Sequence, residues 1–239
     1  MLFKYIRQKA YEKKLRALDV PDVFRSCFEQ VKNLETRKHI RDIGFIVFDT
    51  ETTGLRPARG DVLLSIGALG FTRGRVDLSK SFYELIRPER EIPRDSVLVH
   101  TLTPGKMKDL SPVSDVLVRF LEFCQGAVLV GHHTAFDVEF INAALKKYFG
   151  LPLANRVLDT AKIARGIQKT QEPGKVAIEG ARNFSLDYLA KSFNIKAPDR
   201  HDAYADALVT ALIFQRQIAL LQKEGMSRLK DFLRIGEVR

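Results

Sequence analysis

Cysteine is scarce in this sequence, and no long apolar run occurs in it. The two cysteines, Cys27 and Cys124, lie far apart and form no CxxC pair. This excludes a disulfide framework and the usual zinc patterns, and it favours a reducing compartment. No stretch reaches the ~18 apolar residues that span a bilayer, and residues 1–7 lack the apolar core of a signal peptide. We therefore expect a cytoplasmic protein with no membrane partner.

Negative charge is also in short supply. Lys and Arg number 39 against 29 Asp and Glu, so the formal net charge is +10. A surplus of this sign favours polyanionic partners, above all nucleic acid, although a solvated basic surface gives the same count. Hydrophobic residues make up 45% of the 239 residues, which is enough for a core and excludes general disorder and collagen.

The order of the expected elements predicts an α/β domain with an N-terminal helical extension. Residues 1–42 have the pattern of two helices, which either pack on the main domain or dock a partner. In residues 43–239, three meandering strands precede alternating helices and strands, which predicts a layered fold with a mixed sheet. The expected strands are 43–49, 61–71, a third ending at 86, 127–130 and 156–158; the expected helices are 112–123, 135–149, one from 159, 185–193 and 202–223. The polar stretch 169–183 is either a functional loop or a disordered insertion.

Two carboxylates stand at the end of the first expected strand. Asp49 and Glu51 follow an apolar run and lie two positions apart, so in an extended chain both face one side. Charges beside a core need something that neutralises them. Gly54 then ends the strand with a turn. Taken alone, the pair is equally compatible with an acidic strand end that faces water.

Two further acids lie within predicted helices. Asp137 lies in the first turn of a helix, after the buried strand that Gly131 closes, where it would also complement the helix dipole. Asp206 lies within the apolar stripe of the last long helix, where an unpaired carboxylate is costly. His201 comes five residues earlier and, at ~100° per residue, falls off that helical face. We place His201 on the loop that leads into the helix.

If these groups converge, four carboxylates share one pocket. Two charges ~4 Å apart repel by roughly 4 kcal/mol at an effective dielectric of about 20, so four cannot all stay ionised without cations. Oxygen-only ligands select Mg²⁺ or Mn²⁺. Two such ions ~3.5–4 Å apart can hold the attacking and leaving oxygens of a phosphoryl displacement. A neutral histidine nearby can take the proton from the attacking water.

The three acidic segments resemble, in order and spacing, the motifs of the DEDDh (DnaQ-like) 3′–5′ exonucleases, the family of the proofreading epsilon subunit of bacterial DNA polymerase III. The matching segments are Asp49-Thr-Glu51-Thr-Thr-Gly54-Leu55, His132-x-x-x-Phe136-Asp137 and His201-x-x-x-x-Asp206. This resemblance spans residues 43–220. It implies a ribonuclease H-like fold, with a mixed five-stranded sheet flanked by helices.

The resemblance also implies a catalytic set that holds two divalent metal ions, Mg or Mn. Asp49 would bridge both ions. Glu51 and Asp206 would complete one metal site, and Asp137 would help to bind the second ion. His201 would be the general base.

A substrate-binding set is implied in the same way: Thr52, Thr53, Gly54, Leu55, His133 and Phe136. Main-chain groups near Glu51 and Thr52 would hold the terminal 3′ hydroxyl. Leu55 would wedge against the last base and Phe136 would line the pocket, although core packing would explain both side chains. His133 departs from the family, which usually has Asn there, so its hydrogen bond to substrate would depend on pH.

We expect a metal-dependent 3′–5′ exonuclease that releases nucleoside monophosphates from a free 3′ end, single-stranded or frayed, with DNA favoured. Two alternatives stay open: an RNA-directed exoribonuclease of the same family, and a non-catalytic nucleic-acid-binding module associated with a polymerase. The N-terminal helices are the surface expected to meet a polymerase or other protein partner. His100 and His132 are expected to be structural, and Asp159 to be a helix cap.

Overall fold

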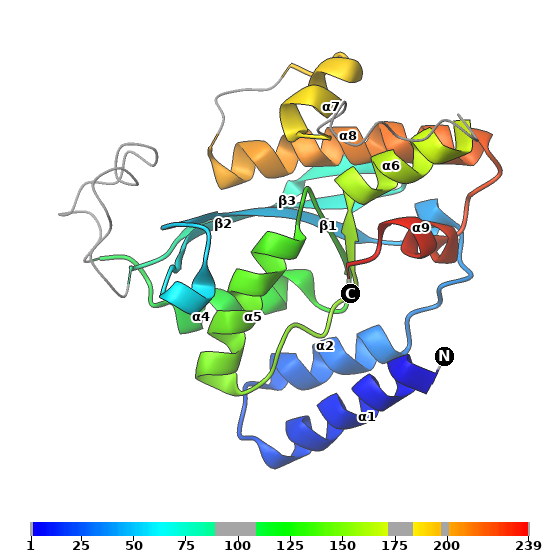
Figure 1. Ribbon diagram of the computed structural model, residues 1–239. Helices are drawn as coiled ribbons and strands as arrows, with labels where there is room; N and C mark the ends of the chain where they lie inside the picture. The colour runs from blue at the N-terminus through cyan, green and yellow to red at the C-terminus, as the bar shows by residue number, and fades with distance from the viewer. Residues whose placement is uncertain (1, 89–108, 172–183, 197–200, 239) are drawn as a thin grey trace.

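A five-stranded mixed sheet forms the centre of the protein (Figure 1). The computed structural model describes residues 2–88, 109–171, 184–196 and 201–238. The strand order is β3-β2-β1-β4-β5. Strands β1, β2 and β3 form an antiparallel meander, whereas β4 and β5 run parallel to β1. The predicted mixed sheet flanked by helices is therefore confirmed.

The boundaries of the elements follow the predicted order. The strands are β1 Phe45–Thr52, β2 Leu63–Thr72, β3 Arg75–Leu85, β4 Val128–Gly131 and β5 Val157–Asp159. The helices are α1 Leu2–Ala17, α2 Asp22–Lys32, α4 Val113–Cys124, α5 Ala135–Phe149, α6 Thr160–Gln171, α7 Leu186–Ser192, α8 Ala203–Lys223 and α9 Leu229–Gly236, with short 3-10 helices η1 Ile40–Asp42 and η2 Pro57–Arg59. The first strand runs beyond its predicted end at residue 49, because β2 pairs with it as far as Thr52.

Side chains that alternate along β1 enter two different cores. Ile46 and Phe48 pack with residues of α2, α4 and α5. Phe45 and Val47 pack with residues of α6, α8 and α9. Figure 1 shows the same division, with α6 and α8 on one side of the sheet and α4 and α5 on the other. The position of a residue along β1, odd or even, therefore decides which helices its side chain meets.

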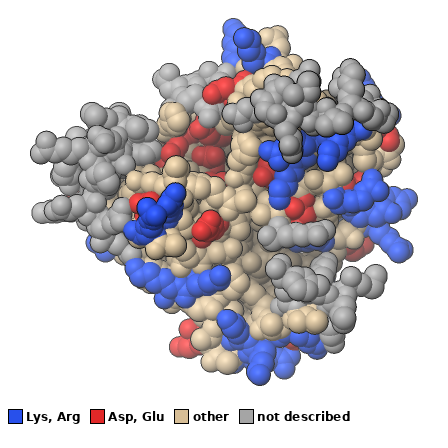
Figure 2. All heavy atoms as spheres, viewed as in Figure 1, with Lys and Arg blue, Asp and Glu red and all other residues tan. Residues whose placement is uncertain are grey.

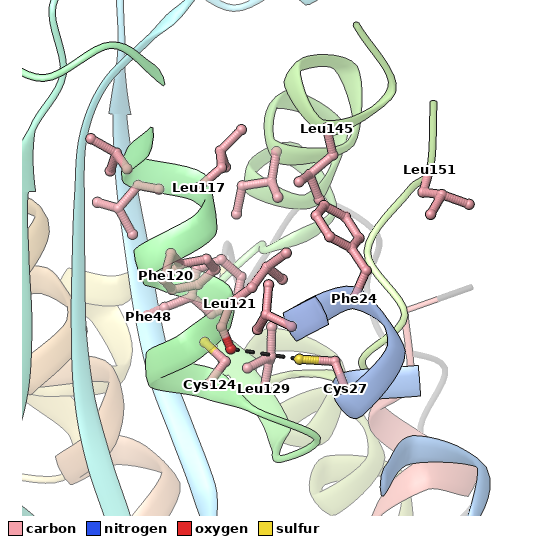
Figure 3. Close-up of a cluster of buried hydrophobic side chains, with 14 of the residues drawn as sticks. Phe24, Cys27, Phe48, Leu117, Phe120, Leu121, Cys124, Leu129, Leu145 and Leu151 are labelled. Carbon is pink, nitrogen blue, oxygen red and sulfur yellow. Dashed lines mark hydrogen bonds between the residues drawn. The ribbon is translucent and has the colours of Figure 1, made fainter. Parts of the chain in front are cut away.

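Helix α2 is part of the core on the α4 side. Its residues Phe24, Cys27 and Phe28 are buried, and the Phe24 ring lies 5.0 Å from that of Phe149 at the end of α5. The Cys27 thiol donates to the Leu121 carbonyl of α4 at 3.6 Å (Figure 3). Burial raises the pKa of Cys27 to about 11, so the thiol stays protonated and can donate.

Some of the sequence predictions lie outside the described residues. His100 is one of them, and so are residues 172–183 of the polar stretch; its first residues, 169–171, are the end of α6. Within the described residues, no helix combines the length and the apolar character needed to cross a membrane.

Candidate active site

The carboxyl end of β1 carries the acidic pair. Asp49 and Glu51 continue the alternation of Phe45 and Val47, so they face α8. The first turn of α8 supplies Asp206, which is buried at 5% exposure. Carboxylate oxygens of Asp49, Glu51 and Asp206 all lie within 4.8 Å of one another. Strand β1 and helix α8 thus bring three of the four predicted acids into one cluster.

Gly67 of β2 allows α8 to approach the sheet this closely. In the β1–β2 ladder, Gly67 lies opposite Asp49. A Cβ at Gly67 would lie 2.4 Å from main-chain atoms of Ala203 and Tyr204, so the start of α8 rests directly on the backbone of β2. Sequence reasoning missed this residue. The available signal was a glycine inside a predicted strand, which often marks a close backbone approach.

His201 lies outside α8, on the segment that leads into it, as predicted. Its side chain is exposed and its φ is +70°, in the left-handed region that non-glycine residues seldom adopt. The next residue, Asp202, caps the helix because its Oδ1 accepts a hydrogen bond from the Ala205 amide at 2.9 Å. The start of α8 is therefore well defined, and His201 stands immediately before it.

Asp137 approaches β1 from the opposite face of the sheet. Its Oδ1 accepts hydrogen bonds from the Thr50 amide at 3.1 Å and the Thr50 hydroxyl at 2.6 Å. Asp137 is not in the three-acid cluster found among the described residues. Burial raises its pKa to about 6, although the hydrogen bonds from Thr50 favour the charged form. Asp137 thus ties the start of α5 to the end of β1.

The turn between β4 and α5 is held by side chains of neighbouring elements. His133 has a φ of +51°, a conformation in which Asn, Asp and His are enriched. Its Nε2–H donates to the Phe184 carbonyl at 3.1 Å, and its amide donates to Asp159 at 3.2 Å. Asp159 also accepts from the first amides of α6, as a cap does. Buried His132 pairs with Thr160 at 2.8 Å, which fits the expected structural role.

The loop that follows β1 is closed by its own hydrogen bonds. The Thr53 amide donates to the Val62 carbonyl at 2.9 Å, and the Val62 amide donates to the Thr53 hydroxyl at 3.0 Å. The Thr52 hydroxyl donates to the Gly54 carbonyl at 2.7 Å. A Cβ at Gly54 would lie 2.5 Å from the Asp61 carboxylate, so a larger residue at this position would displace the Asp61 side chain.

Leu55 and Phe136 differ in their surroundings. Leu55 is 78% exposed, so core packing does not explain it; the closed loop holds a large apolar side chain in solvent. Phe136 is half-buried against the core, with its ring 4.8 Å from that of Phe140. Packing against the core is therefore one reason for a phenylalanine at position 136.

Tyr83 of β3 is a second residue near the cluster that sequence reasoning missed. Its hydroxyl donates to Asp202 Oδ2 at 3.1 Å, and its ring meets that of Tyr204 edge-on at 6.3 Å. Partial burial, together with the charges of Asp202 and Glu51, raises the pKa of Tyr83 to about 12. The phenol therefore remains a neutral donor at physiological pH.

One part of the surface of this basic protein carries a group of acidic side chains. In the view of Figure 2, acidic side chains gather near the region where α8 begins in Figure 1, and Lys and Arg side chains are spread over the rest of the face. On this face, a local group of acidic side chains therefore lies among Lys and Arg side chains, in a protein whose net charge is +10.

Comparison with known proteins identifies relatives. The exonuclease family model (RNase_T) matches residues 46–214. The chain is 34% identical over 183 residues to the DNA polymerase III subunit epsilon of Treponema pallidum, which covers 77% of this chain and 80% of that protein. It is 35% identical over 185 residues to an epsilon-like protein of Rhodobacter capsulatus, covering 77% of this chain but only 25% of that longer protein.

Two solved structures share the fold. Escherichia coli Exonuclease I in complex with a dT13 oligonucleotide superposes with a TM-score of 0.63 at 20% identity, over 77% of this chain and 42% of that chain. The nuclease domain of 3′hExo, a DEDDh family member bound to rAMP, gives a TM-score of 0.63 at 15% identity, over 80% of this chain and 98% of that chain. These likenesses confirm the ribonuclease H-like fold.

The chain belongs to the DEDDh (DnaQ-like) branch of the exonuclease family, as its three motifs predicted. Residues 46–214 are its exonuclease domain.

Replacement of Gly67 by alanine is expected to lower both stability and activity. The new Cβ would push the first turn of α8 off β2 and move Asp206 away from Asp49. Overpacking of this kind costs about 1–3 kcal/mol. Urea unfolding is the measurement, with Gly44→Ala as the matched control because nothing lies within 4 Å of a Cβ at Gly44. Wild-type stability in Gly67→Ala would show that α8 does not rest on β2.

Asp137→Asn is expected to stabilise the metal-free protein in a pH-dependent way. Because the folded pKa of Asp137 is raised to about 6, its contribution to stability is fully present below the unfolded pKa of about 3.9 and is lost as pH rises through about 6. The asparagine side chain cannot ionise, so the variant does not lose this stability as pH rises. The gain should grow from near zero at pH 4 to at most roughly 3 kcal/mol above pH 7.

The measurement is chemical unfolding in the presence of a chelator between pH 4 and pH 8. Asp22→Asn is the control, because Asp22 also stands in the first turn of a helix but its side chain is exposed. A gain for Asp137→Asn that is the same at every pH would contradict the burial of a protonated carboxyl group.

Proposed function

We propose that the chain is a metal-dependent 3′–5′ exonuclease that releases nucleoside monophosphates from the 3′ end of nucleic acid, with DNA favoured. The observation that carries the proposal is the cluster of Asp49, Glu51 and Asp206, whose oxygens lie within 4.8 Å of one another. The epsilon subunit of Treponema pallidum, a DNA polymerase subunit, supports DNA as the substrate. The oligonucleotide in the Exonuclease I structure supports a single-stranded or frayed end.

The donor set fits hard divalent ions. Three carboxylates at this spacing repel one another strongly unless cations are bound, and oxygen-only ligands favour Mg²⁺ or Mn²⁺. Two such ions, when bound, stabilise the charge on the attacking and leaving oxygens of a phosphodiester. We assign Asp49 to both metal sites, Glu51 and Asp206 to the first, and Asp137 to the second. Asp137 lies outside the three-acid cluster and its Oδ1 is hydrogen-bonded to Thr50, so its assignment is supported by the motif resemblance alone.

His201 is proposed as the general base. It is exposed and stands on the segment immediately before α8, which carries Asp206. A neutral imidazole in this position can accept the proton that the attacking water loses. Its location outside the helix leaves the ring able to reach the substrate from solvent.

The loop after β1 and the start of α5 are proposed to bind the substrate. Main-chain groups near Glu51 and Thr52 would hold the 3′ hydroxyl, and the closed turn that contains Thr53 and Gly54 would keep them in place. Exposed Leu55 would wedge against the terminal base.

On the α5 side of the pocket, Phe136 would form part of the wall. His133 would act mainly by shaping the turn after β4, since its Nε2–H already donates to a protein carbonyl.

The division into an N-terminal helical extension, 1–42, and an exonuclease domain, 43–239, is retained as a proposal. Helix α2 shares the core of the domain, so the extension would be a fixed part of the enzyme. The relatives named DNA polymerase III support a polymerase as a partner, and we assign the outer surface of α1 and α2 to that contact.

The test is a degradation assay on 5′-labelled single-stranded DNA and RNA of one sequence, with Mg²⁺, Mn²⁺ or a chelator. We expect a ladder that shortens from the 3′ end, release of nucleoside monophosphates, faster cleavage of DNA, and no cleavage with the chelator. Faster cleavage of RNA would favour the exoribonuclease alternative. Absence of products under either ion would favour the non-catalytic binding module.

Asp49→Asn is expected to reduce activity to background and to raise the melting temperature of the metal-free protein. The substitution removes a ligand proposed for both ions, and it also removes one of the three charges that repel each other. Asp42→Asn, at an exposed acid just before β1, is the control and should retain activity. Substantial residual activity in Asp49→Asn would rule out its bridging role.

His201→Ala is expected to lower kcat by about 10²–10⁴-fold if His201 is the general base. Because the side chain is exposed, the melting temperature should stay close to that of the wild type. His39→Ala, at another exposed histidine, serves as the control. A loss of less than about threefold would assign the proton transfer to another group.

A further inference from the structure

A row of three residues crosses the sheet beneath the start of α8. Tyr83 of β3 lies opposite Gly67 of β2, and Gly67 lies opposite Asp49 of β1. Residues directly opposite each other on neighbouring strands point to the same face, so Tyr83 and Asp49 flank Gly67 on the α8 side. The main chain of Ala203 and Tyr204 rests on Gly67 between them.

Asp202 joins this row to α8. Its Oδ2 accepts from the Tyr83 hydroxyl at 3.1 Å, and its Oδ1 accepts from the Ala205 amide at 2.9 Å. Its main-chain carbonyl accepts from the Asp206 amide at 2.9 Å. One residue thus receives a bond from the sheet and two from the first turn of the helix. The hydrogen bond from Tyr83 connects the start of α8 to strand β3.

We propose that Tyr83 is a positioning residue of the nuclease site, whose hydroxyl holds Asp202 and thereby fixes His201 and Asp206 relative to Asp49. The inference rests on the proposed function, because it assigns Tyr83 a part in the same site. Tyr83 acts through Asp202 and does not touch the reacting atoms. Gly67 determines how closely α8 approaches the sheet. Tyr83 determines the position of the N-cap of α8, Asp202, along the sheet.

The surroundings of Tyr83 fit this role better than a purely structural one. The side chain is 46% exposed on β3, at the edge of the sheet, so the fold does not depend on its burial. A phenol is protonated at physiological pH, so the Tyr83 hydroxyl donates and the Asp202 carboxylate accepts. The Tyr204 ring, edge-on at 6.3 Å, restricts the position of the phenol from the helix side.

Tyr83→Phe removes only the hydroxyl and tests the proposal. We expect kcat to fall by about 3- to 30-fold with KM nearly unchanged, because small displacements of catalytic groups slow the chemical step more than they weaken binding. Hydrogen exchange at the Ala205 and Asp206 amides should become faster. Tyr148→Phe is the matched control, since Tyr148 is similarly exposed at 38% but lies near the end of α5.

A double-mutant cycle distinguishes action through Asp202 from an independent role. The Tyr83→Phe and Asp202→Ala double variant should be no slower than Asp202→Ala alone. Additive losses, a raised KM with unchanged kcat, or wild-type kcat and exchange in Tyr83→Phe would each overturn the proposal. If the wild-type protein has no nuclease activity, the proposed function fails, and the exchange rates of α8 still decide whether Tyr83 holds the helix start.

Discussion

Mutual repulsion among three carboxylates is the constraint on which the rest of the site depends. Asp49, Glu51 and Asp206 have oxygens within 4.8 Å of one another, an arrangement that is unfavourable without cations. Hydrophobic packing on either side of β1 holds them there; Phe45, for example, packs against Phe214 of α8 at 5.2 Å. The apolar core therefore fixes the strand and the helix, and it keeps the main-chain positions of the three acids close together despite the repulsion. Under the proposed function, the ligands for the metal ions are in place before the ions bind.

The sheet divides the acids between two environments. Asp49 and Glu51 face α8, whereas Thr50, one position between them, meets Asp137 from α5. Asp137 is buried where it meets Thr50, and its raised pKa follows from that burial. Protonation of Asp137 would affect cation binding at the cluster, because Asp137 contacts Thr50, which lies between Asp49 and Glu51 on β1. A proton on Asp137 reduces the negative charge at the end of β1, and a cation at the cluster favours its loss.

Local patterns in the sequence predicted much of this site. Alternation along β1 predicted that Asp49 and Glu51 share a face, and helical periodicity predicted that His201 lies off the face of Asp206. Periodicity could not predict the register of β2 and β3 against β1, which is set by contacts between residues distant in the chain. The contact between α8 and Gly67 was therefore missed, and so was the position of Tyr83 opposite Gly67. The pairing of Asp137 with Thr50 was missed because it requires knowing that α5 and α8 cover opposite faces.

The charge of the whole protein and the charge of the site have opposite signs, and distance explains why both can serve one function. A net charge of +10 attracts a polyanion over a range comparable to the Debye length of roughly 8–10 Å, whereas the acids act on groups in contact with them. A phosphate backbone drawn in by the basic surface would be repelled by the bare acidic cluster. Cations at the cluster reverse that local sign, so they would be needed for substrate to settle at the site as well as for the chemical step. Salt should then weaken the long-range attraction by the basic surface much more than the binding of phosphate at the cation-loaded cluster. The contacts at the cluster are too short to be screened.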